Sequence, residues 1–345
     1  MEKIAILGGS GYVGMELFRL LSFHQEVEIV YVTSERYVGK PLKLLNPTIR
    51  GEVNKKFSSI DDVNNMDVVF SCLPHGTLNS VLDRIITKTD RIIDLSADFR
   101  LNSTTDYHKW YGGEHPWPEL LDQFIYGIPE LHREQMVGAK YVSSAGCNAT
   151  ATILGLFPLV KEGIIEDRII TEVKVGSSEG GKTVNTGSHH PERVRSLRSY
   201  QPSSHRHSAE VIQELGVSDF HMSATAVDMV RGVLATSHTF LNEENIDINE
   251  KALWRIYRKY YENEPFMRII KENRGNYRYP DPKTLLASNY CDVGFELDPT
   301  TGRIVILSAI DNLMKGAAGQ AVQAFNVMMG YGETTSLGFP GLYLY

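Results

Sequence analysis

The 345-residue chain is 42% hydrophobic and 22% charged, which is typical of a folded globular protein and not of a disordered one. Its length suits two domains, and its formal net charge of −7 excludes general electrostatic binding of nucleic acid. Three widely separated cysteines form neither a metal nor a disulfide pattern, and we find no signal peptide and no apolar run long enough to span a bilayer. We therefore expect a cytoplasmic protein that does not enter a membrane.

A glycine-rich turn near the start of the chain predicts a dinucleotide site. Residues 3–7 are expected to form a short buried strand, and residues 15–21 have helical spacing. The turn between them has the spacing GxxGxxG and consists of Gly8, Gly9, Ser10, Gly11, Tyr12, Val13 and Gly14. Small residues let the backbone approach a pyrophosphate, whose charge is stabilised at a helix N-terminus. The alternative is a tight turn that binds no ligand.

The end of the second expected strand, residues 27–33, indicates which dinucleotide binds. An NAD site often has an acidic residue here for the ribose hydroxyl. This chain instead continues with Ser34, Glu35 and Arg36. A hydroxyl and a guanidinium suit a 2′-phosphate, so we favour NADP(H). The alternative is that Arg36 is a solvated loop cation.

Two further strands are expected at residues 66–72 and 92–95, and polar or turn residues follow both. Ligands of a parallel sheet bind at the carboxyl ends of its strands. Ser71, Leu73 and Pro74 are therefore candidates for the nicotinamide site, and His75 and Arg100 for the substrate site. They can equally be turn residues. Residues 104–135 are rich in aromatic side chains, which predicts an ordered excursion from the sheet.

A fifth strand, at residues 141–144, leads to Cys147. We expect a helix from Cys147 through Val160, which Pro158 should kink or shorten. A helix N-terminus carries unpaired N–H groups and partial positive charge, and both stabilise the thiolate form of cysteine. Cys147 is thus a candidate nucleophile. The alternative is a small, buried and inert side chain.

The second half of the chain has a different pattern. Strands are expected at residues 168–175, 222–227, 237–241, 291–297 and 303–310, and helices at 207–215, 249–262 and 265–272. We predict an α/β fold with a Rossmann-type NADP-binding domain, residues 1–147, and an α+β domain, residues 148–315, with a mostly antiparallel sheet. A final helix at about 316–330 should pack back on the first domain.

Residues 176–210 are polar, and four of the 11 histidines lie there: His189, His190, His205 and His207. We expect no metal site, because an arginine stands between the last two histidines and no carboxylate cluster accompanies them. A histidine can instead stabilise a thiolate and move a proton at neutral pH. His207 opens a helix-like segment, and His205 is its competitor. Nearby arginines suit phosphate or carboxylate, namely Arg195, Arg198 and Arg206.

Several motifs together resemble the N-acetyl-γ-glutamyl-phosphate reductases over nearly the whole chain. They are the glycine turn, residues 94–100, 126–130 and 144–150, and His205-Arg206-His207 followed by Glu210. The resemblance implies reduction of an acyl phosphate to an aldehyde by NADPH through a cysteine thioester. It implies that Cys147 and His207 are catalytic and that Asn312 contacts the cofactor. It places at the substrate Arg100, Asn148, Ser178, Arg198, His205 and Arg206.

One loop departs from the usual pattern of that family. The arginine-pathway enzymes usually have Ser-Gly-x-Ser-Gly-Ala-Gly, whereas this chain has Gly-Ser-Ser-Glu-Gly-Gly at residues 176–181. It is similar to the branch whose substrate, α-aminoadipyl or glutamyl phosphate, is tethered to a small acidic amino-group carrier protein in lysine or arginine biosynthesis. Four arginines can steer such a partner, namely Arg193, Arg195, Arg198 and Arg206. The resemblance also implies a homo-oligomer, either a dimer or a tetramer.

Other functions remain open at this point. The nearest are reduction of the free, acetylated glutamyl phosphate and an aspartate-semialdehyde dehydrogenase activity. A non-catalytic NADP-binding regulator would leave Cys147 buried and inert. A cysteine hydrolase would leave the glycine turn unexplained. The sequence does not distinguish aminoadipyl from glutamyl substrates, or His207 from His205 as the acid and base.

Overall fold

The computed structural model describes residues 1–49, 54–272 and 274–342. The chain divides into two compact units. Unit 1 contains Met1–Ala145 and Ala317–Gly338, and unit 2 contains Gly146–Gly316 and the residues from Phe339 on. We had placed the domain boundary between residues 147 and 148, whereas in this division Cys147 belongs to unit 2.

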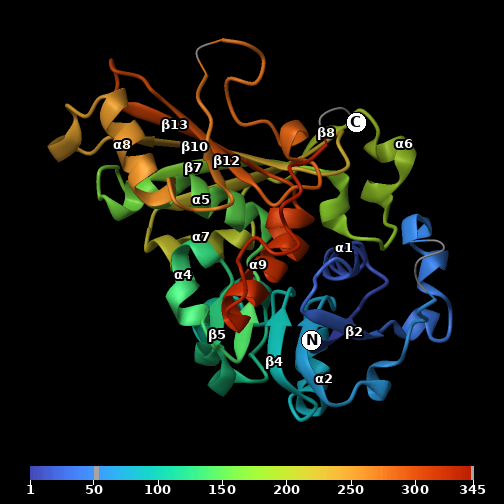
Figure 1. Cartoon of the computed structure of the whole chain (residues 1–345). Helices are drawn as coiled ribbons and strands as arrows, with labels where there is room; N and C mark the ends of the chain where they lie inside the picture. Colours follow the sequence, from blue (N-terminus) through green and yellow to red (C-terminus); the bar gives the residue numbers. More distant parts are fainter. Residues whose placement is uncertain (50–53, 273, 343–345) are drawn as a thin grey trace. The chain divides into compact units, whose positions relative to one another are not determined.

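The sheet of unit 1 has the strand order β2-β1-β3-β4-β6-β5, and each neighbouring pair is parallel. Its strands are β1 (Glu2–Leu7), β2 (Val27–Val32), β3 (Met66–Ser71), β4 (Thr89–Asp94), β5 (Phe124–Tyr126) and β6 (Tyr141–Ser143). Its helices are α1 (Tyr12–Leu21), α2 (Thr77–Ile85), α3 (Thr104–Tyr111), α4 (Pro129–Met136) and α9 (Gly319–Met329) (Figure 1). The expected Rossmann-type sheet is confirmed.

The core of unit 1 explains why its strands are almost continuously apolar. Leu7, Val69 and Ile92, from three adjacent strands, are completely buried, as expected for a parallel sheet covered on both faces. The C-terminal helix α9 packs against α1 and α4. A buried hydrogen bond of 2.8 Å joins His24, just after α1, to Asn326 on α9. A segment from the end of the chain thereby completes the unit.

The glycine turn is tight because three of its residues, Gly8, Gly9 and Gly14, have no room for a side chain. Gly8 has a φ of 72°, and a Cβ there would lie 2.6 Å from the carbonyl oxygen of Cys72 on the neighbouring strand end. A Cβ on Gly14 would lie 2.7 Å from the carbonyl oxygen of Gly8. The start of α1 can therefore approach the end of β1 only when positions 8 and 14 are both glycine.

Unit 2 contains a mixed sheet with the strand order β11-β12-β13-β10-β7-β9-β8. The pairs β7–β9 and β11–β12 are parallel, and the other neighbours are antiparallel. Its strands are β7 (Ile169–Val175), β8 (Leu197–Gln201), β9 (Phe220–Val227), β10 (Val233–Phe240), β11 (Met267–Ile269), β12 (Cys291–Leu297) and β13 (Arg303–Ile310). The mostly antiparallel sheet predicted for the second domain is confirmed.

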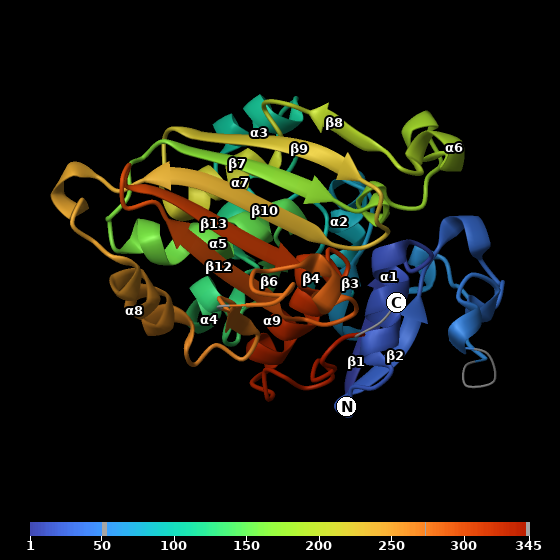
Figure 2. The same ribbon diagram turned by 90° about the horizontal axis from the view of Figure 1, so that it is seen from above.

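Four helices are described in unit 2: α5 (Cys147–Lys161), α6 (His190–Arg193), α7 (His207–Leu215) and α8 (Glu250–Tyr261). Figure 2 shows the strands side by side with α5 and α7 beneath them. Helix α5 packs on β10, β12 and β13, and α7 packs on α5 and β9. The helices therefore cover one face of the sheet and bring the N-terminal end of α5 close to α7.

Pro158 does not shorten α5, contrary to one of our two expectations. The helix continues to Lys161. A proline cannot donate to the carbonyl one turn earlier, which here belongs to Leu154. The hydroxyl of Tyr261, from α8, donates to that carbonyl at 2.5 Å instead. The hydrogen bond that proline removes is thus replaced by a side chain of another helix.

Three other expectations were wrong in detail. Residues 265–272 are not helical, because Met267–Ile269 form β11 and pair with β12. The polar segment 176–210 contains a short strand, β8, and a short helix, α6, which we had not predicted. The final helix begins later than expected, because Met314–Ala318 adopt a π-helical turn before α9.

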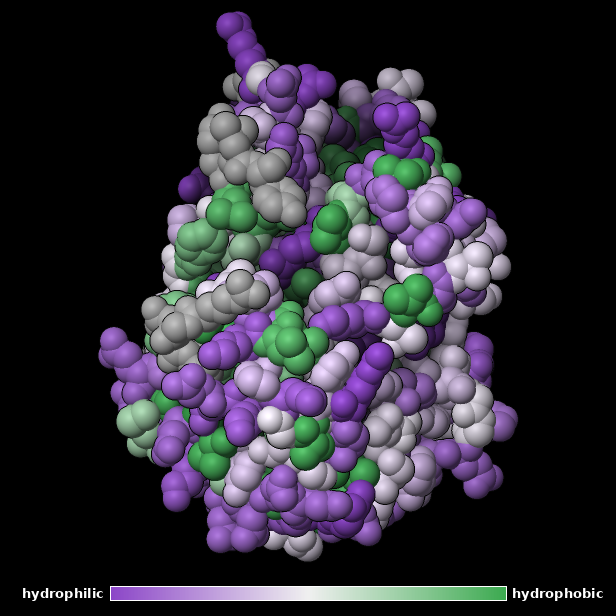
Figure 3. Space-filling model, turned by 90° about the vertical axis from the view of Figure 1, so that its right-hand side faces the viewer, coloured by the Kyte–Doolittle hydropathy of each residue, from purple (hydrophilic) through white to green (hydrophobic). Residues whose placement is uncertain are grey.

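The surface mixes polar and apolar side chains. On the face in Figure 3, hydrophobic residues in green are scattered among hydrophilic residues in purple. Within the described ranges, no helix is both long and apolar enough to cross a membrane.

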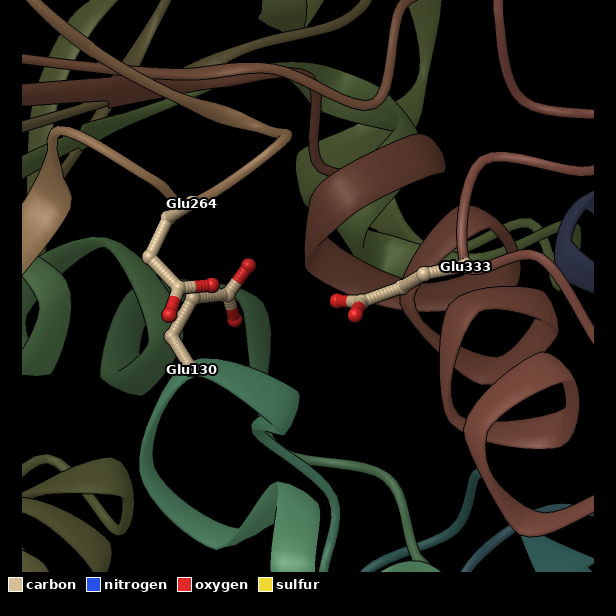
Figure 4. Close-up of side chains that lie close together, drawn as sticks. All are labelled: Glu130, Glu264 and Glu333. Carbon is tan, nitrogen blue, oxygen red and sulfur yellow. The ribbon is translucent and has the colours of Figure 1, made fainter. Parts of the chain in front are cut away.

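Acidic side chains hold the end of α9 within unit 1. The Gln323 amide on α9 donates to Glu130 at 3.0 Å and to Glu333 at 2.8 Å. Arg133 on α4 forms an ion pair with Glu333 at 2.9 Å. Figure 4 shows the two carboxylates reaching toward each other from α4 and from the segment after α9. These contacts connect α4 to the C-terminal part of unit 1.

We predict that Gly14→Ala weakens unit 1. The added methyl group would overlap backbone atoms of Gly8 and Gly9, and such overpacking costs about 1–3 kcal/mol. The measurement is the urea concentration at half-unfolding, which should fall. Gly338→Ala is the matched control, because its Cβ meets no atom within 4 Å. Equal midpoints for the two variants would contradict this account of the turn.

Candidate active site

Cys147 is the first residue of α5, and Gly146 is the N-cap. The Cys147 side chain is half-buried. Gly316 packs directly against it, since a Cβ at that position would lie 2.7 Å from the Cys147 Cβ. The thiol therefore lies where the unpaired N–H groups of a long helix begin, as the sequence predicts.

A buried carboxylate connects this helix start to α7. The Gly146 backbone N–H donates to Glu210 Oε2 at 2.8 Å. The other oxygen of Glu210 lies 3.9 Å from Nε2 of His207, one helical turn earlier on α7. Glu210 is completely buried, and His207 is almost completely buried. Glu210 thus connects the residue before the cysteine with a histidine.

His205 differs from His207 in its hydrogen bonds and its charge. Nδ1 of His205 accepts from the His207 backbone N–H at 3.2 Å, and the two rings meet edge to face with centroids 4.7 Å apart. Burial, followed by the nearby Arg206 charge, lowers the pKa of His205 to about 4. At neutral pH His205 is therefore uncharged and orients the start of α7, which favours His207 as the acid and base.

A second set of polar groups lies next to the thiol. The Cys147 Sγ is 3.7 Å from Asn148 Oδ1, and Asn148 Nδ2 donates to Glu179 Oε1 at 3.2 Å. The Tyr200 hydroxyl, from β8, donates to the same Glu179 oxygen at 3.3 Å. Burial raises the pKa of Glu179 and also that of Tyr200. Asn148 thus lies beside the thiol, and its substrate role remains a prediction.

Ser178 and Asn312 form one buried pair in unit 2. Asn312 Nδ2 donates to Ser178 Oγ at 2.9 Å, and Asn312 Oδ1 accepts from the Gly232 N–H at 2.8 Å. The side chain predicted for the cofactor therefore holds the turn after β7 and the start of β10. The cofactor role of Asn312 remains a prediction.

The predicted cationic residues differ in exposure. Arg198 and Arg206 are exposed, and Arg198 donates to the Glu192 carbonyl at 2.7 Å. Arg193 is partly buried and donates to the carbonyls of Val175 and Val227, at the ends of β7 and β9. Arg193 therefore has a structural role in addition to any role toward a ligand.

A cavity of about 620 Å³ lies within unit 2, next to this segment. Most of its polar lining is cationic or carries a hydroxyl group. The lining includes Ser177, Ser188, His190, Arg193, Asp228, Arg231, Asp281 and Lys283. Ser177 and Glu179 belong to the same short turn, Ser177–Gly180. The cavity and the polar groups beside Cys147 thus share a structural element.

The residues predicted to bind the dinucleotide all belong to unit 1, except Asn312. Ser34 Oγ donates to Ser10 Oγ at 2.9 Å, so the end of β2 contacts the glycine turn. Tyr12 is exposed, and Val13 is partly buried. The Arg36 guanidinium is exposed and lies 5.4 Å from the centre of the Tyr37 ring. This arrangement fits NADP(H), because the turn leaves backbone room for a pyrophosphate and Arg36 presents a cation near Ser34.

Glu35 differs from the neighbouring candidates, because its carboxylate accepts from the Ile60 backbone N–H at 2.8 Å. It therefore supports the loop that follows β2. Its carboxylate also accepts from the Ser59 hydroxyl in the same loop, and its cofactor role remains a prediction.

At the ends of β3 and β4, buried acids organise the predicted nicotinamide and substrate residues. Asp98 accepts from His75 Nδ1 at 2.7 Å and from the Gly76 N–H at 2.6 Å, which caps α2. Ser71 is completely buried beside Asp94, whose pKa is raised to about 6, first by burial and then by Asp98. Leu73 is partly buried and Pro74 is exposed, so these two can contact a ligand.

Arg100 is buried, unlike the other arginines predicted to bind substrate. Its guanidinium donates to the carbonyls of Ser144 at 2.9 Å and Leu95 at 3.1 Å. These contacts join the ends of β4 and β6. Its predicted role toward the substrate remains a prediction.

Glu179, Tyr200 and the bridging role of Glu210 were not predicted from the sequence. Glu210 had a signal, because it lies one turn after His207 on the predicted helix. The only sequence signal for Glu179 was its position in the loop that departs from the usual motif. Tyr200 had no sequence signal, because the edge strand that carries it is almost entirely exposed.

We predict that His205 makes the stability of the protein dependent on pH between 6.5 and 4. Its pKa is about 4 in the folded protein and 6.5 ordinarily. Its contribution is therefore complete above pH 6.5 and is lost as the pH falls toward 4. Relative to His205→Gln, the wild type should lose roughly 1.4 kcal/mol of unfolding free energy per pH unit in this range.

Urea unfolding at pH 7, 5.5 and 4.5 measures this difference. The variant of an exposed histidine, His189→Gln, is the control and should follow the wild type. Parallel pH dependences for wild type and His205→Gln would contradict the assignment of a neutral, buried His205.

Comparison with known proteins identifies the family. Residues 3–139 match the model of the semialdehyde dehydrogenase NAD binding domain, and residues 147–312 match that of the semialdehyde dehydrogenase dimerisation domain. The LysW-L-2-aminoadipate/LysW-L-glutamate phosphate reductase of Sulfurisphaera tokodaii is 47% identical, with 99% of each chain covered. The LysW-L-2-aminoadipate 6-phosphate reductase of Deinococcus radiodurans is 45% identical, with 99% of this chain and 98% of that protein covered.

Solved structures agree on the fold. Aspartate semialdehyde dehydrogenase II of Vibrio cholerae has a TM-score of 0.67 at 15% identity, with 95% of this chain and 98% of that chain covered. The Candida albicans enzyme, solved with NADP, has a TM-score of 0.63 at 15% identity with the same coverage. The chain therefore belongs to the semialdehyde dehydrogenase family, and it is an oxidoreductase related over almost its whole length to these phosphate reductases.

Proposed function

We propose that the protein reduces an acyl phosphate carried by a small acidic carrier protein, α-aminoadipyl or glutamyl phosphate, to the semialdehyde with NADPH. The proposal places the reaction in lysine or arginine biosynthesis. The observation that carries it is the arrangement of Cys147 at the start of α5, with the Glu210–His207 pair bonded to the preceding residue. Relatives at 45–47% identity have names that specify such substrates.

In the first step the Cys147 thiolate attacks the acyl carbon, and the bond to the phosphate oxygen breaks. The products are a thioester and inorganic phosphate. The helix N-terminus stabilises the thiolate before attack, and its N–H groups can stabilise negative charge on the substrate. Exposed Arg198 and Arg206 are the candidate ligands of the leaving phosphate. Dividing the reaction at a thioester makes each step easier.

In the second step the thioester becomes an aldehyde. NADPH, bound at the glycine turn, supplies the hydride that reduces the acyl carbon. His207 gives a proton to the oxygen of the reduced carbon and takes it back as the carbon–sulfur bond breaks. Glu210 holds the imidazole in place and stabilises it in its charged form. Cys147 is then free for another turnover.

The carrier protein is the finer part of the proposal. Arg195, Arg198 and Arg206 are exposed around β8 on a chain whose net charge is −7. The neighbouring cavity adds Arg231 and Lys283 to its lining. A local cationic surface on an acidic protein favours an acidic partner and accelerates its association. We assign this surface to the carrier and the adjacent cavity to the arm that presents the substrate.

The assembly and the location of the enzyme are also proposals. The face of the unit 2 sheet opposite α5 bears exposed Ile170 and Phe240, together with Leu234 and Thr236. A second copy of the chain can cover this face, which supports a homo-oligomer, a dimer or a tetramer. All three cysteines are in the thiol form and none is part of a disulfide. A catalytic thiol must stay reduced, which supports a cytoplasmic location.

Replacing Cys147 tests the nucleophile. Cys147→Ser should reduce kcat by roughly 10⁴-fold or more, because no thioester forms, while NADPH binding measured by fluorescence should be unchanged. Cys72→Ser is the matched control, since burial and the charge of Asp94 raise the pKa of that thiol and keep it inert. Substantial turnover by Cys147→Ser would refute the mechanism.

The two histidines are distinguished in the same assay. His207→Asn should lower kcat by about 10²–10⁴-fold through loss of proton transfer. His205→Asn should have a much smaller effect, because His205 is uncharged at the pH of the reaction. A reversed order of the two effects would assign the proton transfer to His205.

The substrate class is tested by comparing four acyl phosphates under one condition with NADPH. They are carrier-linked aminoadipyl, carrier-linked glutamyl, free N-acetylglutamyl and free aspartyl phosphate. We expect kcat/KM to be highest for one or both carrier-linked substrates. Preference for the acetylated compound or for aspartyl phosphate would support the corresponding alternative, and no turnover of any would favour a non-catalytic NADP-binding protein.

Arg36 should determine the preference for NADPH. Arg36→Ala removes a charged contact to the 2′-phosphate and should raise KM for NADPH by about 10- to 100-fold, whereas KM for NADH should change little. Lys40→Ala removes a nearby exposed cation and is the control. Equal effects on the two dinucleotides would place Arg36 outside the cofactor site.

A further inference from the structure

A carboxylate that the mechanism does not use lies two contacts away from the thiol. Glu179 belongs to the turn Ser177–Gly180, Asn148 to α5 and Tyr200 to β8. Glu179 Oε1 accepts from Asn148 Nδ2 at 3.2 Å and from the Tyr200 hydroxyl at 3.3 Å. Three separate elements of unit 2 therefore meet at one carboxylate beside Cys147.

This contact determines which end of the Asn148 amide faces the sulfur. A carboxyl oxygen that carries no proton only accepts hydrogen bonds, so Glu179 Oε1 binds the amide NH₂ group. The amide oxygen is then turned toward Cys147 Sγ, at 3.7 Å. An oxygen can accept a hydrogen bond from a thiol, but it repels a thiolate. The resting arrangement thus favours the protonated form of the cysteine.

We propose that Glu179 is a positioning residue, which holds the Asn148 amide and the Tyr200 hydroxyl so that Cys147 stays in its less reactive, protonated form until this arrangement is disturbed. The proposal rests on the proposed function only in taking Cys147 as the nucleophile. When the Asn148–Glu179 bond opens, the amide can rotate and present its NH₂ group to the sulfur. The same amide then stabilises the thiolate.

Other charged and polar groups on the adjoining elements also affect the equilibrium between the thiol and thiolate forms of Cys147. The Tyr200 hydroxyl interacts with Asn148 and Cys147 as well as with Glu179. Burial is the largest effect and raises the pKa of Glu179, whereas Arg206 and Arg193 act in the opposite direction. Among the described residues, further titratable groups on the adjoining elements are His205, His207 and Glu210 around α7 and buried Lys315, which precedes Gly316 and lies over the Phe266 ring.

Alkylation of the ligand-free enzyme by iodoacetamide tests the proposal without any turnover. The rate at Cys147 is followed by mass spectrometry of its peptide between pH 5 and 10, which separates it from Cys72 and Cys291. Glu179→Gln replaces the carboxyl group by a neutral amide, whose oxygen is a weaker acceptor than a carboxylate oxygen, and so loosens the contact that holds the Asn148 NH₂ group. The inflection in the plot of Cys147 alkylation rate against pH should move to lower pH in this variant. At pH values below the wild-type inflection, alkylation of the variant should be about 5- to 10-fold faster than that of the wild type.

Two controls accompany this variant. Glu179→Asp keeps the charge and should retain an inflection close to that of the wild type. Glu172→Gln removes a carboxylate of the same unit that pairs with Lys174 at 2.8 Å, and it should match the wild type. An unchanged or higher inflection in Glu179→Gln would overturn the proposal.

Asn148→Ala distinguishes positioning from a direct effect of charge. If Glu179 acts through the amide, Glu179→Gln should change the inflection much less in the Asn148→Ala background than in the wild type. A full shift in that background would show direct repulsion and would refute the positioning role. Should Asn148→Ala not fold, Asn148→Leu answers the same question, because its similar-sized side chain has neither an NH₂ group nor a charge to present to the sulfur.

The role of Glu179 and the proposed function can each be refuted without the other. Loss of activity on every acyl phosphate would refute the proposed function and would leave the alkylation profiles intact. Conversely, a normal reductase with identical alkylation profiles in wild type and Glu179→Gln would refute only the role of Glu179.

Discussion

The arrangement of the catalytic groups depends on one hydrogen bond, from the Gly146 N–H to the buried carboxylate of Glu210. The first N–H groups of a helix have no partner within the helix, and a carboxylate placed there gains from the helix dipole. Because Glu210 comes from α7, this bond determines how α7 meets the start of α5. His207, one turn before Glu210, lies on the helix that this bond connects to the start of α5. An N-terminal capping contact thus also links the element of the proposed nucleophile to that of the proposed proton carrier.

The same constraint explains why polar groups can be so deeply buried here. Glu210, His205, His207, Asn148 and Asn312 are all nearly or completely inaccessible. Buried polar groups are costly unless they are hydrogen-bonded. The contacts among α5, α7, β8 and the turn Ser177–Gly180 satisfy the groups that the mechanism needs.

Local patterns in the sequence predict much of this fold. The strand, glycine turn and helix of the first 21 residues have a largely local signal, because Gly8 adopts a positive φ and a Cβ on Gly14 would meet Gly8 within the same turn. The distant Cys72 carbonyl adds a second reason for glycine at position 8. Cys147 was expected at a helix start because small residues precede it and an apolar run follows. Residues 265–272 were assigned to a helix wrongly, because only pairing with β12, distant in sequence, makes Met267–Ile269 a strand. The edge strand β8 has almost no buried side chain and so no detectable periodicity.

The site itself is less accessible to sequence reasoning than the fold. Cys147 and His207 were proposed from the sequence, and their roles remain predictions. The Glu210 bridge, the Glu179 carboxylate and Tyr200 depend on contacts between residues that are 21 to 64 positions apart. The replacement of a proline-broken hydrogen bond by Tyr261, about 100 residues away, is of the same kind. Residue types and local spacing determine which groups are available, whereas tertiary packing determines which of them act together.

The central claim is that Cys147 becomes acylated before any hydride transfer. The most direct measurement mixes the enzyme with a carrier-linked acyl phosphate in the absence of NADPH and records both released phosphate and the intact mass of the protein. The account predicts about one equivalent of phosphate per active site and a mass increase of one acylated carrier, located at Cys147 and removable by hydroxylamine. Phosphate release that strictly requires NADPH, with no adduct at Cys147, would contradict it.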